Sequence, residues 1–133
     1  MLTRRRFAAC TLCAVTGFLA TGVEAQNPPP GLKRTIITRT DGPMEGYETV
    51  DVRVDLDAGT VVPRHTHPGV ESSYVVEGVL ELSVDGEGTR SLKAGDGFQV
   101  PTQRPHSGKN GDKPTILAVT YVVEKGKPLA SPA

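Results

Sequence analysis

The sequence of 133 residues predicts an all-β fold, in which short antiparallel strands form a sandwich or barrel. Residues 50–56 and 79–84 alternate apolar and polar side chains, which is the period of a strand with one face against a core. Asp85-Gly86 follows the second run and is a strong hairpin signal. Between residues 33 and 124 we find no convincing helical period and no internal repeat. The pattern leaves no room for the crossover helices that parallel strands need.

Each expected strand has a local reason. Residues 50–56 carry valine or leucine at every second position and charged residues between them. Arg53 therefore lies on the water-facing side, where we expect it to be solvated rather than catalytic. Residues 79–84 place two leucines and a valine inward in the same way, and Gly78 before them marks a tight turn or bend. The remaining strands are expected at residues 36–39, 61–67, 72–77, 97–100 and 115–123.

The first 25 residues resemble a twin-arginine signal peptide. The run Thr3-Arg4-Arg5-Arg6-Phe7 is similar to the twin-arginine consensus and leads into a mildly apolar stretch, residues 8–23. Ala25 ends the segment with a small residue, so we expect cleavage before Gln26. An uncleaved anchor is the alternative, although a spanning helix needs about 20 strongly apolar residues. The resemblance implies export of the folded chain to the periplasm or beyond, with no stable membrane insertion after cleavage.

Both cysteines, Cys10 and Cys13, lie in this segment, so the mature domain has neither a disulfide nor a thiolate ligand. Without residues 4–6 and Glu24, the 15 basic and 15 acidic residues fall to 12 and 14, a net charge of about −2. Such a chain has no basic patch to hold phosphates, and we expect no nucleic-acid partner. Its length suits one compact domain and is too short for two.

The expected domain lies between two irregular ends. Residues 26–32 include Asn27-Pro28-Pro29-Pro30-Gly31 and are expected to form a Pro-rich, extended linker. Residues 125–133 are expected to form a flexible tail. The domain itself then covers residues 33–124.

The three histidines, His65, His67 and His106, are candidates for a metal site. His65 and His67 are two residues apart, so on an extended strand both imidazoles leave the same face, roughly 6 to 7 Å apart at the backbone. Pro68-Gly69 then reverses the chain, and Glu71 can return a carboxylate toward the imidazoles. Imidazole nitrogens with one carboxylate oxygen suit a divalent transition metal (Fe, Mn, Ni, Cu or Zn) rather than calcium or magnesium.

These residues stand in two spaced motifs, Gly59-x5-His65-x-His67-x3-Glu71-x6-Gly78 and Gly95-x5-Pro101-x4-His106-x3-Asn110. Together they resemble the motifs of the cupin superfamily, except at Gln103, where glycine is usual. If that position needs a positive φ, glutamine adopts it at an energetic cost. The resemblance implies a single cupin jelly-roll barrel of antiparallel strands over residues 33–124, a homodimer, and one metal ion held by His65, His67, Glu71 and His106.

The resemblance also implies a metalloenzyme that acts on a small oxygenated substrate. Dioxygenase chemistry is the commonest in the superfamily, and isomerase, decarboxylase and lyase members share the ligand set. The alternative is a non-catalytic cupin that binds a metal or a small molecule, because no histidine remains to serve as a free base. Catalytic residues are not assigned. The polar candidates for substrate contact are Tyr47, Tyr74, Tyr121, Ser73 and Gln99. Ordinary packing or surface exposure also explains each of them.

Overall fold

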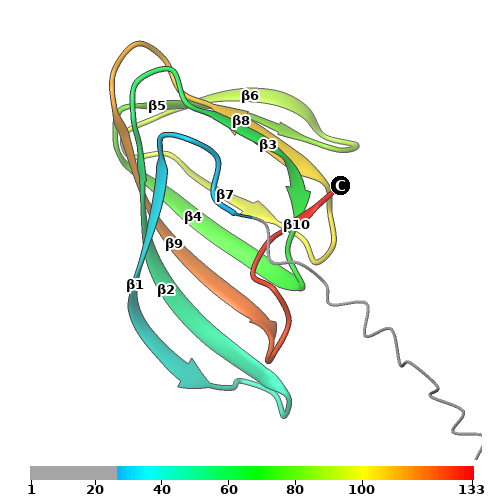
Figure 1. The fold of residues 1–133 in the computed structure, drawn as a ribbon. Coiled ribbons are helices and arrows are strands. Elements are labelled where there is room, and N and C mark those ends of the chain that lie inside the picture. The colour runs from blue at the N-terminus through cyan, green and yellow to red at the C-terminus, as the bar shows by residue number, and fades with distance from the viewer. Residues whose placement is uncertain (1–26) are drawn as a thin grey trace, which may run out of the picture.

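The computed structural model describes residues 27–133 as ten strands in two antiparallel sheets that face each other in a jelly roll (Figure 1). The all-β prediction is confirmed. The predicted signal peptide, residues 1–25, lies outside the described residues. The strands are β1 (Leu32–Asp41), β2 (Tyr47–Leu56), β3 (Val61–Thr66), β4 (Gly69–Glu77), β5 (Val79–Val84), β6 (Gly88–Lys93), β7 (Gly97–Val100), β8 (His106–Lys109), β9 (Thr115–Glu124) and β10 (Ser131–Pro132).

Strands that are distant in sequence are neighbours in both sheets. One sheet has the order β1-β2-β9-β4-β7, and the other has the order β10-β3-β8-β5-β6. Strands β3 and β4 each pair with a strand from the second half of the chain, β8 and β9 respectively. This interleaving brings His106 directly opposite His65. Within residues 27–133 no helix has the length and hydropathy that crossing a membrane requires.

The alternation predicted for β2 and β5 is confirmed by burial. Arg53 lies on the outer face, where its guanidinium donates hydrogen bonds to Asp55 at 2.8 to 3.1 Å. Burying one of the inward valine or leucine side chains of these strands stabilises the fold by roughly 1.5 to 3 kcal/mol. The inward residues of these strands and of β9 form the core, and they include Val50, Val52, Val54, Leu56, Leu80, Leu82, Val84, Leu117, Val119 and Val123.

Two segments differ from the expectation. The first strand begins at Leu32 rather than near residue 36, because the polar residues Lys33, Arg34 and Thr35 hide its apolar alternation in the sequence. Residues 125–133 are not a flexible tail throughout, since β10 pairs with β3 and Ala130 is buried. The return of this segment depends on a contact with β3 that no local pattern reveals.

Glycines allow close packing at both ends of β4. A Cβ atom at Gly69 would lie 1.9 Å from the carbonyl oxygen of Val122 in the neighbouring strand. Gly78, expected to mark a bend, has a φ of 85°, and a Cβ there would meet the carbonyl oxygen of Pro114 at 2.5 Å. The first of these glycines keeps the start of β4 against β9, and Glu71 lies two residues further along the same strand.

We predict that Gly69→Ala destabilises the fold by roughly 1 to 3 kcal/mol, because the added methyl group meets backbone atoms that cannot move aside. Urea unfolding of the purified domain measures the change. The matched control is Gly97→Ala, whose Cβ would meet its nearest neighbour at an ordinary 3.4 Å. Equal stability of the two variants would contradict the tight β4–β9 contact.

Candidate metal centre

The three histidines converge between the two sheets. His65 lies in β3 and His106 begins β8, directly across the ladder, while His67 follows the end of β3. Their ring centroids are 4.2 to 5.0 Å apart, and each side chain offers a nitrogen within 4.8 Å of the others. All three side chains are buried. The expected grouping of the histidines is therefore present.

A backbone carbonyl orients each imidazole. The Nδ1 atom of His65 donates to the Pro63 carbonyl at 2.8 Å, and that of His106 donates to the Arg104 carbonyl at 2.9 Å. The Nδ1 atom of His67 donates to the Leu129 carbonyl at 2.5 Å, across 62 positions in sequence. Because a carbonyl oxygen only accepts, Nδ1 carries a proton in each ring, and in the neutral ring Nε2 keeps its lone pair.

Glu71 places a carboxylate beside these lone pairs. Its Oε2 atom lies 2.9 Å from the Nε2 atom of His67 and 3.3 Å from that of His106. Its Oε1 atom accepts a hydrogen bond from the Ser73 hydroxyl at 2.6 Å, which fixes the orientation of the carboxylate. The four side chains named as ligands in the sequence are thus all adjacent, in the arrangement that the strand spacing indicated.

The electrostatics of the group favour a bound cation. Burial would raise the pKa of Glu71, but its contacts with His106 and His67 outweigh that effect and hold the pKa well below its usual range. Burial, with the nearby His106, lowers the pKa of His65 to about 4, so its imidazole is neutral at pH 7. Within residues 27–133, the Nε2 atoms of His67 and His106 have no hydrogen-bond partner. Buried lone pairs that face a carboxylate need a proton or a metal ion between them.

His106 behaves differently from His65 because it faces the carboxylate. Burial alone would lower its pKa, but the Glu71 carboxylate and the Arg104 carbonyl outweigh burial and raise it. A proton therefore competes for the position between His106 and Glu71. The donor set of three imidazoles and one carboxylate fits a divalent transition metal at the same position.

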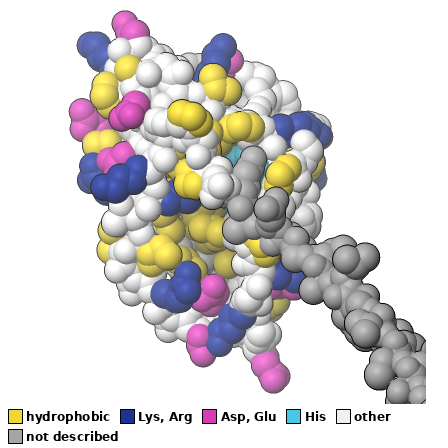
Figure 2. Space-filling view, viewed as in Figure 1, with side chains coloured by type: hydrophobic (Ala, Val, Ile, Leu, Met, Phe, Trp, Pro, Cys, Tyr) yellow, Lys and Arg dark blue, Asp and Glu magenta, His cyan; other side chains and the backbone are white. Residues whose placement is uncertain are grey.

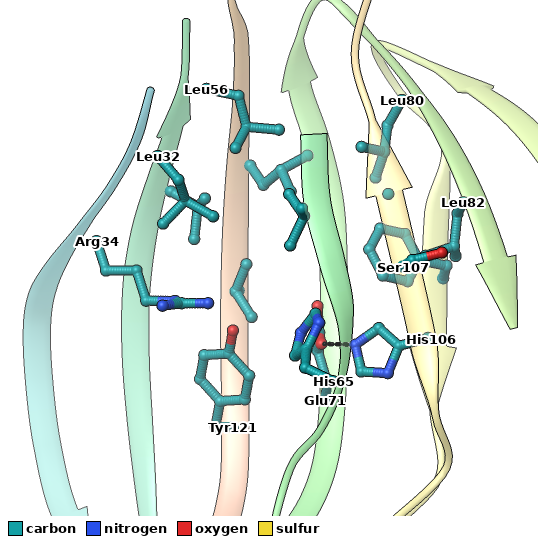
Figure 3. A pocket seen from close by; sticks show the side chains of 16 residues that line it. Leu32, Arg34, Leu56, His65, Glu71, Leu80, Leu82, His106, Ser107 and Tyr121 are labelled. Carbon is teal, nitrogen blue, oxygen red and sulfur yellow. Dashed lines mark ion pairs between the residues drawn. The ribbon is translucent and has the colours of Figure 1, made fainter. Parts of the chain in front are cut away.

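A cavity opens beside the group, between the two sheets (Figure 3). The cavity has a volume of about 50 Å³, and of about 450 Å³ when the adjoining space open to solvent is included. Its wall is mostly aliphatic, with Leu32, Leu56, Leu80 and Leu82 among the lining residues. In the space-filling view, hydrophobic side chains gather around a hollow near the middle of the face, and histidine is visible only as a small patch (Figure 2).

Of the polar side chains proposed for substrate contact, Tyr121 lines this cavity. Its ring lies 4.8 Å from that of His67, and burial, together with the Glu71 carboxylate, raises its pKa. Ser73 contacts Glu71 instead. The others lie away from the cavity: Tyr47 is at the start of β2, Tyr74 is exposed, and Gln99 donates to the Ser72 hydroxyl on an exposed surface.

The remaining motif residues support the loops around the site. Gln103 has a φ of 57°, the only positive φ of a non-glycine residue among residues 27–133. The position therefore does need the positive φ that glycine usually supplies, and glutamine adopts it at an energetic cost. Its backbone N–H donates to the His67 carbonyl at 3.1 Å. Asn110 is buried and its side-chain amide donates to the Asp57 and Lys113 carbonyls at 2.8 and 3.1 Å. Both residues act on the backbone rather than in the cavity.

Two contributors to the site, Arg34 and Leu129, were not predicted from the sequence. Arg34 lines the cavity, and its signal was the spacing Leu32-x-Arg34, which places the arginine on an apolar face. Leu129 acts through its carbonyl, which has no signature in a sequence.

Comparison with known proteins supports the fold. The chain is 29% identical over 80 residues to dimethylsulfoniopropionate lyase DddQ of Ruegeria pomeroyi, and the match covers 60% of this chain and 40% of the lyase. It is 34% identical over 94 residues to polyketide synthase CurC of Streptomyces cyaneus, over 68% of this chain and 58% of that protein. The matches thus span less than two thirds of either curated relative.

Among solved structures, KdgF from Halomonas sp. superposes with a TM-score of 0.62 and 27% identity, over 75% of this chain and 87% of KdgF. Residues 52–123, more than half of the chain, match the cupin domain family along strands β2 to β9. The chain therefore belongs to the cupin domain family.

Proposed function

We propose that this protein is an exported, metal-dependent enzyme that acts on a small oxygenated organic substrate. The observation that carries the proposal is the meeting of three buried imidazoles and the Glu71 carboxylate at the side of a cavity. His65, His67, Glu71 and His106 would hold one divalent ion. Such an ion would polarise a substrate oxygen or, if it is redox-active, exchange electrons with the substrate.

The protein's own residues prepare this position. The carbonyls of Pro63, Leu129 and Arg104 hold the three imidazoles in the tautomer that presents Nε2 to the centre. The Ser73 hydroxyl holds one oxygen of Glu71 and leaves the other facing the imidazoles. Aliphatic side chains around the cavity exclude water and strengthen the electrostatic interactions inside it.

Two reaction classes share this ligand set, namely dioxygenation and the non-oxidative lyase or isomerase reactions. The similarity to a protein named as a lyase supports the second class. The phenol of Tyr121 lines the same cavity, and because its raised pKa keeps it protonated, it can donate a hydrogen bond to a substrate.

The experiment loads the purified domain separately with Fe, Mn, Ni, Cu or Zn and supplies a panel of diketones, flavonols, thiols and hydroxy acids. Consumption of dioxygen identifies a dioxygenase, and product formation without dioxygen identifies a lyase or isomerase. We expect turnover with at least one ion, and none after His106→Ala. Absence of turnover with every ion would support the second candidate function.

That second candidate is a non-catalytic cupin that binds a metal or a small molecule. The predominantly aliphatic cavity wall favours it, and all three histidines of the chain are already in the centre. No imidazole is left to act as a free general base.

A homodimer is part of the proposal. Strand β1 is at an edge of its sheet within the described residues, and Ile36 and Ile37 on it are 54% and 64% exposed. Exposed apolar side chains on an edge strand favour pairing with a second copy.

Export through the twin-arginine route is also a proposal, based on residues 3–7. We predict that replacing Arg4 and Arg5 together by Lys stops the appearance of the protein in the periplasm, because the paired guanidinium groups are the recognised feature. Cell fractionation with an antibody to the domain measures the distribution. The matched control, Lys33→Arg, leaves export unchanged. Continued export of the double variant would contradict the proposal.

We predict that His67→Ala lowers metal affinity at least tenfold, because the chelate falls from four donors to three. Competition with a chromophoric chelator measures Kd. The control is Gln103→Gly, which relieves the strain of a positive φ without removing a metal ligand, and it should leave metal content unchanged. Unchanged affinity in His67→Ala would remove His67 from the ligand set, and loss of metal in Gln103→Gly would give Gln103 a role in placing His67.

We predict that the metal-loaded protein melts well above the metal-free form at about pH 7.5, and that the gap narrows toward about pH 5. A hundredfold excess of metal over Kd stabilises the native state by about 2.7 kcal/mol. Protons compete with the ion for the Nε2 atom of His106, and this competition strengthens as the pH falls through the raised pKa of His106.

The metal-free form has its own pH dependence. His65 has a pKa near 4 in the folded protein, so below about pH 6.5 the unfolded chain binds a proton there that the folded chain does not. This contribution lowers metal-free stability as the pH falls from about 6.5 to 4. The raised pKa of His106 adds stability at higher pH, as the pH falls through that pKa toward about 6.5, and its contribution stays constant below about pH 6.5. Calorimetry of both forms across this range measures the gap. Equal melting temperatures at pH 7.5 with saturating metal would exclude the metal site.

A further inference from the structure

Arg34 is a charged side chain on the inner face of the barrel. It lies in β1 opposite Val54, whose side chain is in the core, and it lines the cavity beside the metal centre. Its guanidinium extends from the sheet into the cavity, toward the hydroxyl of Tyr121 and the side where His65 and Glu71 lie (Figure 3). An arginine in this position directs its hydrogen-bond donors at whatever the cavity holds.

Arg34 has no acidic partner among residues 27–133, and its Nε atom is buried without a hydrogen-bond acceptor. Glu71 shares the cavity, but its oxygens face Ser73 and the imidazoles. Other arginines are exposed and paired with acidic residues, including Arg39 with Glu48 at 3.2 Å and Arg53 with Asp55 at 2.8 Å. Arg34 is half-buried with its Nε atom fully buried, and withdrawing a guanidinium from water without an anion is costly, so stability does not account for an arginine at this position.

We propose that Arg34 binds a carboxylate of the substrate, which defines the substrate class as small carboxylic acids that carry a second oxygen donor. The planar guanidinium matches a carboxylate through two parallel hydrogen bonds. The second oxygen donor would lie at the metal centre, and this half of the inference rests on the proposed function. The aliphatic wall between the two ends accommodates a short hydrocarbon chain.

The charge of the cavity favours a carboxylate over a phosphate. One guanidinium balances one negative charge, and the Glu71 carboxylate is already present in the same cavity. A doubly charged phosphate would leave an uncompensated charge in a buried position. The Tyr121 hydroxyl beside the guanidinium offers the carboxylate one further donor.

The test uses two probes of the same shape with the zinc-loaded protein. Succinic acid monohydroxamate and its neutral amide, succinamohydroxamate, both chelate zinc and differ only in carboxylate against carboxamide. Calorimetric titration should show the acid binding at least tenfold more tightly than the amide. Arg34→Met should bind both equally, and Arg34→Lys should keep part of the preference. The control Arg39→Met changes an exposed arginine of the same strand that does not line the cavity, and it should keep all of the preference.

A metal-free measurement makes the Arg34 inference independent of the metal. In the metal-free protein, acetate should shift the Nε–Hε NMR signal of Arg34 in a saturable way, and acetamide should not. Inorganic phosphate serves as the competing anion. The assignment would be overturned if acetate did not shift the signal. It would also be overturned if phosphate saturated the shift at a lower concentration than acetate.

Outcomes for the two proposals are distinguishable. If neither hydroxamate binds the zinc-loaded protein while acetate shifts the Arg34 signal, the metal function fails and the carboxylate site stands. If the amide binds as tightly as the acid, the carboxylate site fails and the metal function stands. Thermal unfolding of metal-free Arg34→Met provides a further check, since loss of an unpaired, half-buried charge should leave the melting temperature unchanged or higher. A marked fall would assign Arg34 a structural role instead.

Discussion

The central constraint in this structure is the close approach of a buried carboxylate to imidazole lone pairs. Glu71 lies 2.9 and 3.3 Å from two Nε2 atoms whose rings carry their protons on the opposite nitrogen. Without a positive charge between them these groups repel one another, and burial prevents water from screening the repulsion. The surrounding barrel must therefore hold them in place, and a cation at this point relieves the electrostatic cost.

The jelly roll meets this requirement by recruiting backbone groups from remote segments. Cross-strand pairing sets His65 opposite His106. The tight contact of Gly69 with β9 holds the start of β4 close to that strand and so fixes the position of Glu71 two residues later. Carbonyl oxygens then fix the ring orientations. Because strands rather than loops carry two of the histidines and the glutamate, the positions of these groups are determined by sheet register.

Most of the fold and the four central side chains could be predicted from local patterns. The alternation in β2 and β5 identifies inward residues directly, and the His65-x-His67 spacing identifies a shared face. What escaped prediction depends on partners distant in sequence. For Arg34 the sequence offers only the spacing Leu32-x-Arg34, and the pairing of β1 with β2 is what shows that the arginine faces inward. Strand β10 consists of a serine and a proline, and only its pairing with β3 identifies it as a strand. The backbone carbonyl of Leu129 is an acceptor that any residue at this position would supply, so the sequence does not identify it.

The contact between His67 and Leu129 couples the centre to a segment at the edge of the second sheet. Strand β10 holds this segment through a short ladder, the pairs Ser131–Thr66 and Pro132–His65, so its opening is expected to cost less than global unfolding. When it opens, His67 loses the acceptor that sets its tautomer, and its Nδ1 and Nε2 atoms can exchange the proton. The apparent affinity of the centre then scales with the fraction of molecules in which the segment is closed. Ligand release can thus be governed by a peripheral opening equilibrium, without any rearrangement of the barrel.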